Sequence, residues 1–360
     1  MTWLWTHLPW HSSKKLWIPE VNDKPTNIDP ISGQQLGKSI DLNSKKQQLE
    51  FRFPTGDFQQ AYLDAYQTSE QLSELTASTR IRQHQVKDKI NPIKGVKNII
   101  AVASGKGGVG KSTVSVMLAK GLQKLGANVG LLDADIYGPS IPKMLGVSQK
   151  PESPDQKTFL PVDADGLQTM SLGYILGEKD PAIWRGAMVT KALMQMIEDT
   201  RWSNLDYLIM DLPPGTGDIQ LTMIQRIPVT AAVLVTTPQD IALLDAQKAL
   251  AMFNKVEIPV LGVIENMSTY VCEACGHEAH IFGQHGGQKM ADEFSVPLLG
   301  QLPLNIDIRT HMDGGQPNIL WRDEHPLQEQ ALMMAMRAAQ NLSNLPIKFS
   351  LTDSLKLHKI

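Results

Sequence analysis

A glycine-rich segment with two lysines, residues 103–113, carries the strongest chemical signal in the chain. Its sequence, ASGKGGVGKST, satisfies the phosphate-loop pattern G-x-x-x-x-G-K-S and adds a second lysine, Lys106, near its start. An apolar run with β-branched residues precedes it at 98–103, and apolar residues at helical spacing follow it at 114–125. We therefore expect the loop to join a strand to a helix N-terminus, where backbone N–H groups and the helix dipole favour phosphate.

Different residues of this loop are expected to have different roles in binding a nucleotide. The glycines let the backbone turn and approach phosphate oxygens. Lys111 is expected to contact the β- and γ-phosphates of ATP, and Ser112 to ligate Mg²⁺. A glycine-rich turn that binds nothing is the alternative, which the flanking strand and helix disfavour. The predicted nucleotide-binding set is Gly105, Lys106, Gly107, Gly108, Val109, Gly110, Lys111, Ser112 and Thr113.

Three aspartates end or follow apolar runs that we expect to be strands. Asp133 ends the run 129–133, Asp135 comes two residues later, and Asp211 ends the run 207–211. In sheets of this type, ligands bind beyond the carboxyl ends of the strands. Asp211 is therefore predicted to hold Mg²⁺ through water, and Asp135 to reach the Mg²⁺ shell or orient the attacking water. A solvated or helix-capping acid is the alternative, which is stronger for Asp133.

Two further contacts to the nucleotide are predicted after such runs. Gly215 and Gly217, in the sequence DLPPGTGD, supply a backbone that can shift when a γ-phosphate is present, with a rigid proline turn as the alternative. Asn266 follows the run 260–265, and its amide can pair with a base edge. Taken alone, Asn266 is only a turn residue.

The second chemical signal is the C-x-x-C formed by Cys272 and Cys275, followed by His277 and His280. Thiolates select zinc or iron–sulfur clusters, but two cysteines are half of a four-thiolate set. Either the two histidines complete a zinc site within one chain, or two chains give four cysteines to one shared centre, and the spacing alone leaves these nearly even. A redox dithiol is the third interpretation, although the motif does not open a helix in a thioredoxin-like unit.

The composition is that of an ordinary globular protein. The chain has 360 residues, of which 42% are apolar, and its formal net charge is −3. That charge supplies no basic field for nucleic acid, and no apolar run approaches the roughly 18 residues of a membrane span. The N-terminus lacks the basic and apolar regions of a signal peptide. We therefore expect a cytoplasmic location, where a single pair of cysteines indicates metal or redox chemistry.

Four regions are predicted along the chain. Residues 1–45, with four of the seven tryptophans, read as a poorly ordered lead; 46–91 as a small α+β unit; 92–345 as a P-loop ATPase domain; and 346–360 as a C-terminal tail. Nearly continuous apolar strands are typical of a sheet covered on both faces, so the predicted fold class is α/β, doubly wound around a mostly parallel sheet. Strands are predicted at 98–103, 129–133, 207–211, 231–237 and 260–265, and helices at 241–254, 287–294 and 327–342.

The loop with its second lysine resembles the deviant Walker A motif of the MinD/ParA-like ATPases, which include nitrogenase iron protein and the arsenite-pump ATPase. Four further motifs, together with the C-x-x-C, resemble the Mrp/ApbC family of iron–sulfur cluster carrier ATPases. They are LDADIYGPSIP at 132–142, DLPPGTGD at 211–218, ENMS at 265–268 and IFG at 281–283. The resemblance covers about residues 93–345.

This resemblance implies a homodimer that binds ATP and Mg²⁺ and holds a 4Fe-4S cluster at the dimer interface. The cluster comes from a donor and is delivered to apo iron–sulfur proteins. Lys106 matches a lysine that reaches the partner's nucleotide, and Asp135 matches a carboxylate that positions water. The implied catalytic residues are Lys106, Lys111, Asp135 and Asp211; the implied adenine contact is Asn266; and the implied cluster ligands are Cys272 and Cys275.

Two other functions stay open. The first is a MinD/ParA-like positioning ATPase on a membrane or DNA, which the acidic net charge and the faintly amphipathic segment 351–360 disfavour. We expect neither nucleic acid nor stable membrane insertion. The second is a zinc-stabilised regulatory ATPase, which depends on how the C-x-x-C is completed.

Overall fold

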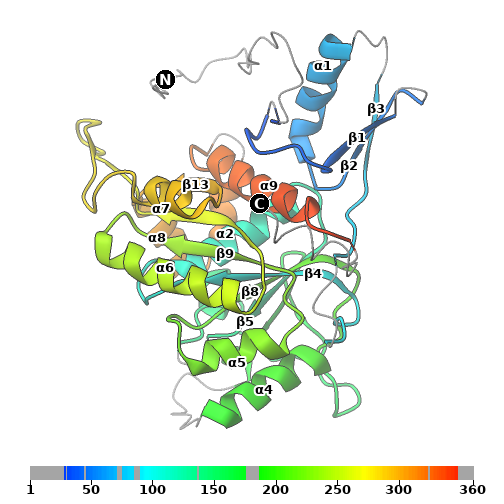
Figure 1. The fold of residues 1–360 in the computed structure, drawn as a ribbon. Coiled ribbons are helices and arrows are strands. Elements are labelled where there is room, and N and C mark those ends of the chain that lie inside the picture. The colour runs from blue at the N-terminus through cyan, green and yellow to red at the C-terminus, as the bar shows by residue number, and fades with distance from the viewer. Residues whose placement is uncertain are drawn as a thin grey trace.

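The computed structural model describes residues 28–29, 31–43, 46–70, 75–84, 90–135, 138–175, 186–322 and 325–347. Within them the chain forms a large α/β body and a small N-terminal unit (Figure 1). The sheet of the body has the strand order β13-β10-β9-β4-β8-β5-β7-β6, and its pairs are parallel except for β6 with β7 at one edge. This confirms the predicted doubly wound, mostly parallel fold.

Five strands of this sheet match the predicted apolar runs to within two residues at either end. They are β4 (Val96–Ala103), β5 (Val129–Asp133), β8 (Leu205–Asp211), β9 (Ala231–Thr236) and β10 (Val260–Asn266). The other three lie toward the edges, where they are less apolar and were not predicted. They are β6 (Val162–Ala164), β7 (Leu167–Ser171) and β13 (Leu298–Leu302).

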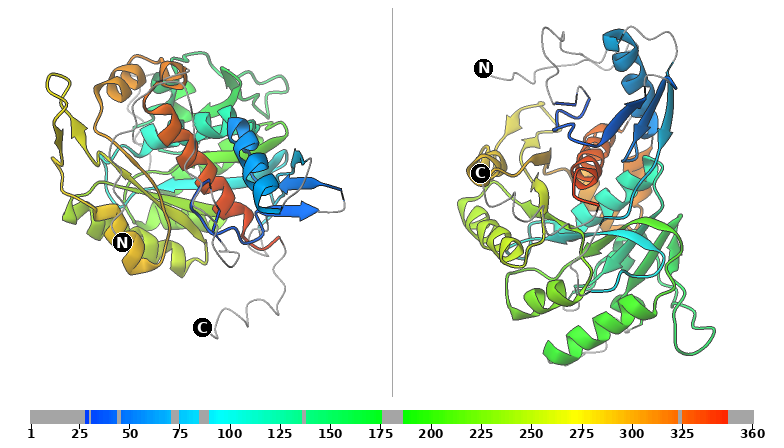
Figure 2. Two further views of the ribbon diagram at one scale, coloured as in Figure 1. Left: turned by 90° about the horizontal axis from the view of Figure 1, so that it is seen from above. Right: turned by 45° about the vertical axis from the view of Figure 1, so that its right-hand side comes forward.

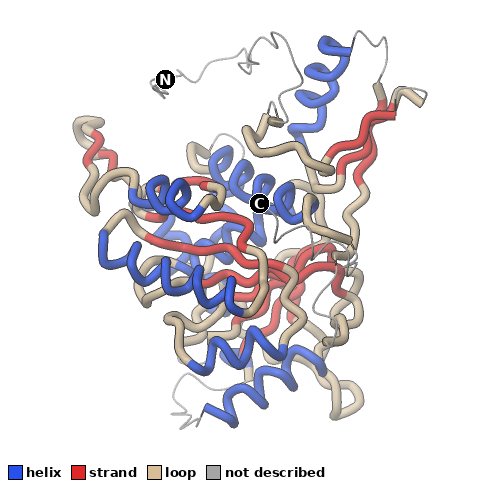
Figure 3. The backbone as a smooth tube through the Cα atoms, in the orientation of Figure 1, coloured by secondary structure: helices blue, strands red, loops and turns tan. Residues whose placement is uncertain are grey.

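Helices cover both faces of the sheet (Figure 3). One face packs against α2 (Lys111–Lys124), α3 (Ile141–Leu145), α8 (Ile306–Asp313) and α9 (Gln328–Ser343). The other packs against α4 (Gly186–Asp199), α5 (Asp218–Arg226), α6 (Asp240–Lys255) and α7 (Gly286–Phe294). Short 3-10 turns lie at η2 (Leu172–Tyr174) and η3 (Pro317–Trp321). None of the helices in the described ranges has the length and apolarity of a membrane span.

Neighbouring residues of β4 point to opposite faces of the sheet. Ile100 and Val102 join the apolar cluster under α2 and α9, whereas Ile99 and Ala101 join the cluster on the other face. Side chains alternate along a strand, so a strand covered on both faces needs an apolar residue at nearly every position. This is the physical reason for the continuous apolar runs in the sequence.

The N-terminal unit is a three-stranded sheet with one helix. It contains β1 (Ile40–Asn43), β2 (Gln48–Phe51), β3 (Thr76–Thr79), η1 (Gly56–Phe58) and α1 (Gln59–Glu70). Its core holds the rings of Phe51, Phe53 and Tyr62, with centroids 5.1 to 6.1 Å apart. The unit lies on the side of the body formed by α9 (Figure 2).

Residues 28–43 correct the prediction of a poorly ordered lead up to residue 45. Asp29 is buried and accepts hydrogen bonds from Tyr62 Oη at 2.9 Å and from Gln340 Nε2 on α9 at 2.7 Å. The partner on α9 lies 311 positions along the chain, so no local pattern could indicate the contact. The tryptophan-rich start and nearly all of the tail 346–360 lie outside the described residues.

Candidate functional site

The predicted phosphate loop joins β4 to α2. Gly108 and Gly110 both have φ of +80°, which side chains rarely adopt. Space is also restricted, because a Cβ at Gly110 would lie 2.1 Å from Asn266 Nδ2. Helix α2 begins directly after Gly110 with no side-chain cap. Its first backbone N–H groups therefore face the loop, as an anion requires.

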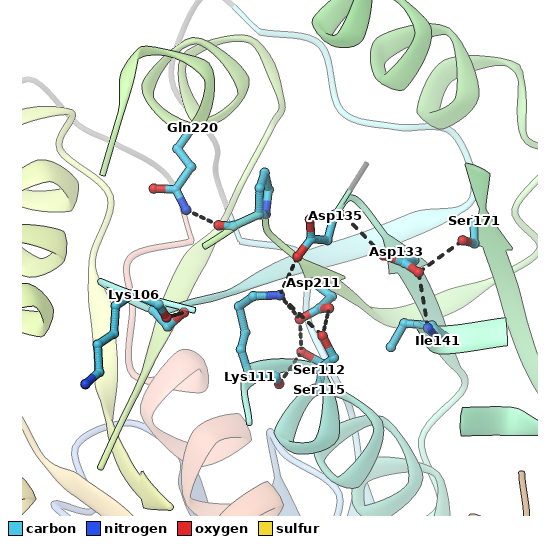
Figure 4. Close-up of polar contacts among 12 residues, drawn as sticks. Lys106, Lys111, Ser112, Ser115, Asp133, Asp135, Ile141, Ser171, Asp211 and Gln220 are labelled. Atoms are coloured by element: carbon cyan, nitrogen blue, oxygen red, sulfur yellow. Dashed lines mark hydrogen bonds and ion pairs between the residues drawn. The ribbon is translucent and has the colours of Figure 1, made fainter. Parts of the chain in front are cut away.

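A buried ionic cluster lies under this loop. Lys111 Nζ is 2.9 Å from Asp211 Oδ1 and 3.8 Å from Asp135 Oδ2, and Figure 4 shows the amine directed at both carboxylates. Ser112 and Ser115 donate hydrogen bonds to the two oxygens of Asp211 at 2.6 and 2.7 Å. The side chain of Lys111 is 6% exposed and that of Asp211 is fully buried. Strands β5 and β8 and helix α2 thus bring three predicted catalytic residues together.

The donors in this cluster fit a magnesium–nucleotide complex. The Ser112 hydroxyl and the Asp211 carboxylate are adjacent oxygen ligands, the type that Mg²⁺ prefers. Lys111 Nζ already lies between two carboxylates, which hold this amino group at the base of the loop. A phosphate bound by the loop would complete the magnesium shell and share this ammonium.

Asp133 holds the backbone beside the cluster. Its Oδ2 accepts hydrogen bonds from Ser171 Oγ at 3.0 Å and from the Ile141 amide at 3.2 Å, and its Oδ1 accepts one from the Asp135 amide at 3.1 Å. Burial raises the pKa of Asp133 to about 7, and the charge of nearby Asp211 acts in the same direction. Asp133 therefore positions Asp135 rather than facing the ligand itself.

The loop after β8 has room to move. Gly215 has φ of +105°, and its amide donates to the Ser104 carbonyl at 3.0 Å. No heavy atom lies within 4 Å of a Cβ added at Gly215 or at Gly217. The start of the loop is held instead, because Gln220 Nε2 of α5 donates to the Pro213 carbonyl (Figure 4).

Lys106 behaves differently from Lys111. Its side chain extends away from the ionic cluster (Figure 4), and Nζ lies 3.4 Å from Gln239 Oε1, immediately before α6. The first turns of α6 carry Ile241 and Leu244, whose relative exposures are 69% and 56%. The structure therefore places the Lys106 amine outside the ionic cluster of its own chain and at the start of α6, a helix whose first turns expose this apolar pair.

Asn266, at the end of β10, lies against the phosphate loop. Its Nδ2 donates to the Val109 carbonyl at 2.9 Å, and its Oδ1 accepts from the Met267 amide at 3.0 Å. The predicted contact with adenine stays a prediction. The bond to the loop was not indicated by the sequence.

The two cysteines lie on a hairpin that projects from the body, between β11 (Tyr270–Val271) and β12 (Glu278–Ala279) (Figure 1). Cys275 is exposed and Cys272 is partly exposed. Backbone N–H groups of Cys275 and Ala274 donate to the Cys272 sulfur and lower the pKa of that thiol. The turn thus favours the thiolate that binds metals.

His277 and His280 do not complete a site with the cysteines. In the part of the chain that the structure describes, no three His, Cys, Asp or Glu side chains are grouped closely enough to hold a metal ion. His280 Nδ1 instead lies 3.4 Å from the Ser268 carbonyl. Within the described residues, the hairpin thus offers two thiols.

Three residues of the phosphate-loop site were not predicted: Ser115, Ser171 and Gln220. Ser115 lies one helical turn after Lys111, so helical periodicity could have placed it beside the Asp211 carboxylate. Ser171 and Gln220 gave no local signal. Their partners, Asp133 and the Pro213 carbonyl, are reached only through the folded sheet or a turn.

Comparison with known proteins gives concordant matches. A family model described as ParA, NUBPL iron-transfer P-loop NTPase, matches residues 95–339. The iron-sulfur cluster carrier protein of Haemophilus influenzae is 55% identical over 251 residues, which are 69% of this chain and 68% of that protein. The iron-sulfur cluster transfer protein NUBPL of Mus musculus is 45% identical over 260 residues, which are 72% of this chain and 82% of that protein.

One solved structure is also similar. A nucleotide-binding protein from Archaeoglobus fulgidus in complex with ADP has a TM-score of 0.57 and 34% sequence identity, and the match covers 64% of this chain and 93% of that chain. The range 95–339 contains both the phosphate loop and the cysteine hairpin.

Proposed function

The chain belongs to the family of NUBPL-type iron-transfer P-loop NTPases, and on that premise we propose that it is an ATP-hydrolysing carrier of 4Fe-4S clusters. Two copies hold one cluster between their cysteine hairpins, receive it from a donor and transfer it to apo iron–sulfur proteins. The names of the two relatives support the cargo, and the phosphate loop supports the nucleotide. A cytoplasmic location, without nucleic-acid or membrane partners, stays a prediction.

The observation that carries this proposal is the exposed pair Cys272 and Cys275 without a third ligand among the described residues. A cluster bound entirely by cysteine needs four thiolates. The chain has only two cysteines, so a second copy supplies the other two. Cluster binding and dimerisation are then one event.

Each residue of the phosphate-loop site has its own role in ATP hydrolysis. The first turn of α2 binds the phosphates, and Lys111 stabilises charge on the β- and γ-phosphoryl oxygens. Ser112 and, through water, Asp211 hold Mg²⁺, which neutralises phosphate charge. Asp135, 3.8 Å from Lys111 Nζ, orients the attacking water. No further general base was identified in the sequence, so we expect slow turnover, suited to timing a transfer.

Lys106 completes the site of the second copy in this proposal. Its side chain extends away from its own ionic cluster, and its amine lies at the start of α6, whose first turns expose Ile241 and Leu244. An apolar pair beside a cation suits a face covered by another protein surface. A dimer formed across this face carries Lys106 toward the partner's nucleotide.

Metal and sulfide analysis of the full chain after anaerobic reconstitution tests the proposal. We expect about four irons and four acid-labile sulfides per dimer, the content of one cluster with four thiolate ligands. The loaded protein should then restore a cluster-dependent apoprotein. Stoichiometric zinc without sulfide would overturn the carrier function and favour the zinc-stabilised ATPase.

A further inference from the structure

Two neighbouring residues at the end of β10, Glu265 and Asn266, contact the phosphate loop on one side and the base of the cysteine hairpin on the other. Side chains of adjacent strand residues point to opposite faces of a sheet. Asn266 therefore points to the face covered by α2, and Glu265 to the face covered by α7. Both residues are buried, at 6% and 1% exposure.

On the first face, Asn266 forms a direct contact with the loop. Its Nδ2 donates to the Val109 carbonyl at 2.9 Å. Gly110, the next residue, lies so close that a Cβ there would be 2.1 Å from the same nitrogen. A loop that shifts to bind phosphate must therefore act on Asn266, because no side chain separates them.

On the second face, Glu265 binds the start of α7, where the chain returns from the hairpin. One carboxylate oxygen accepts a hydrogen bond from the Gly287 amide, and the other accepts one from Gln301 Nε2 at 2.6 Å. A Cβ at Gly287 would lie 2.8 Å from the Glu265 Cβ and 3.1 Å from Oε2. The helix N-terminus thus approaches the carboxylate through a glycine and an amide, a favourable position for a negative charge.

The segment 267–285, which carries the cysteine hairpin, is fixed at both of its ends. It leaves β10 directly after Asn266, where the Ser268 amide and hydroxyl both donate to the Leu302 carbonyl, at 2.9 and 3.1 Å. It returns at Gly286, where a Cβ would lie 2.7 Å from the Pro238 carbonyl oxygen. The cysteines in between extend away from the body, so a small rotation at the base moves them further than the base itself.

We propose that Glu265 and Asn266 are positioning residues that couple nucleotide occupancy of the phosphate loop to the position of Cys272 and Cys275. Asn266 senses the loop, and Glu265 transmits the shift to α7 and the returning arm of the hairpin. The inference rests on the proposed function. It specifies how the state of the nucleotide reaches the cargo site.

The test measures alkylation of the two cysteines by iodoacetamide in the full-length, reduced, cluster-free protein, with and without a Mg²⁺-bound non-hydrolysable ATP analogue. In the unmodified chain we expect the nucleotide to change the alkylation rate by at least about fivefold, the lower end of typical coupling between sites. In Glu265→Gln the carboxylate becomes an amide. Its N–H groups then face N–H donors that had bonded to the carboxylate, and two donors cannot form a hydrogen bond with each other. We expect the ratio of the alkylation rates with and without the analogue to fall to about one, while the Kd for the analogue is unchanged.

Gly287→Ala breaks the same contact from the opposite side. The added methyl group displaces the Glu265 side chain, while alanine has a higher helix propensity than glycine. This variant therefore tests the link even if Glu265→Gln does not fold. The matched control is Asp206→Asn, which alters an equally hydrogen-bonded buried carboxylate at the start of β8, bonded to Lys97 Nζ and the Asn128 amide. The control should keep the ratio of the unmodified chain.

An unmodified chain with no response to nucleotide would overturn the link, as would a full response in Gly287→Ala with nucleotide binding confirmed. Iron and sulfide content separates this failure from failure of the carrier function. A protein that loads a cluster but shows no nucleotide-dependent alkylation retains the proposed function and lacks the link.

Discussion

At the phosphate loop, Lys111 and Asp211 are buried and form an ion pair within one chain, whereas the hairpin that carries Cys272 and Cys275 projects from the body (Figure 1). Under the loop, the Asp211 carboxylate accepts hydrogen bonds from Ser112 and Ser115, which the fold brings to it. At the hairpin, the hydrogen bonds that lower the pKa of the Cys272 thiol come from its own turn.

The phosphate-loop site is thus formed within one chain, whereas the hairpin is, in the proposed function, half of a site shared by two chains. Burial and hydrogen bonds fix Lys111 before a ligand arrives, so little reorganisation is needed when phosphate binds. In the proposed function, two exposed thiols supply half of the ligands of a four-thiolate cluster, so their final geometry depends on the second copy. Changes at the loop should therefore act within one chain, and changes at the hairpin should act on the assembly.

Loss of the hairpin ligands should give the largest effect. We expect Cys272→Ala or Cys275→Ala to remove essentially all cluster iron, because a dimer of either variant keeps only half of the four thiolate ligands. Iron and sulfide analysis after reconstitution measures this loss, with ATP-analogue binding as the control. A variant that keeps its full cluster would show that the hairpin is not the cargo site.

Loss of the loop lysine should remove catalysis and leave the cargo. In Lys111→Ala the charge that faces the β- and γ-phosphates is absent, so kcat should fall by about 10²- to 10³-fold, typical for one preorganised electrostatic contact. Reconstituted iron content should equal that of the unmodified chain. Unchanged ATPase activity would show that this loop is not the active site.

A mixture of two inactive variants should recover part of the activity. Lys106→Ala keeps its own ionic cluster, and Lys111→Ala keeps a lysine that can complete a partner's site. Random pairing makes half of the dimers mixed, each with one intact site, so we expect roughly a quarter of the original rate. No recovery, with mixed dimers confirmed by mass spectrometry, would restrict Lys106 to its own chain.

The smallest effects are expected from removing one polar side chain at each site. Their difference in size would sharpen the contrast between the buried loop and the exposed hairpin. Ser115→Ala deprives buried Asp211 of a donor and should lower the free energy of unfolding by about 1–3 kcal/mol. His277→Ala, on the exposed hairpin, should change it by less than about 0.5 kcal/mol and leave the iron content unaltered. Urea denaturation measures both values. A large loss of bound metal in His277→Ala would instead support zinc ligation by the histidines.

Much of this protein follows from local sequence. The phosphate loop is one contiguous segment with glycines at the positions that need positive φ, such as Gly108 and Gly110, so its place between β4 and α2 could be predicted. The continuous apolar runs of β4 and β8 predicted a sheet covered on both faces, because alternation leaves no polar position when helices pack on either side. The C-x-x-C indicated thiolate chemistry, that of a metal or cluster ligand or of a redox pair, without its geometry.

Contacts between distant segments were decided by the tertiary structure alone. Asp29 reaches Gln340 across 311 positions, which is why the prediction of a poorly ordered lead does not hold for residues 28–29 and 31–43. Glu265 reaches Gly287 only because β10 and α7 pack together, and Lys106 turns toward Gln239 only because α6 starts there. Backbone preference and periodicity act over a few residues. The choice of partner for a polar side chain depends on which segments the packed core brings within hydrogen-bonding distance.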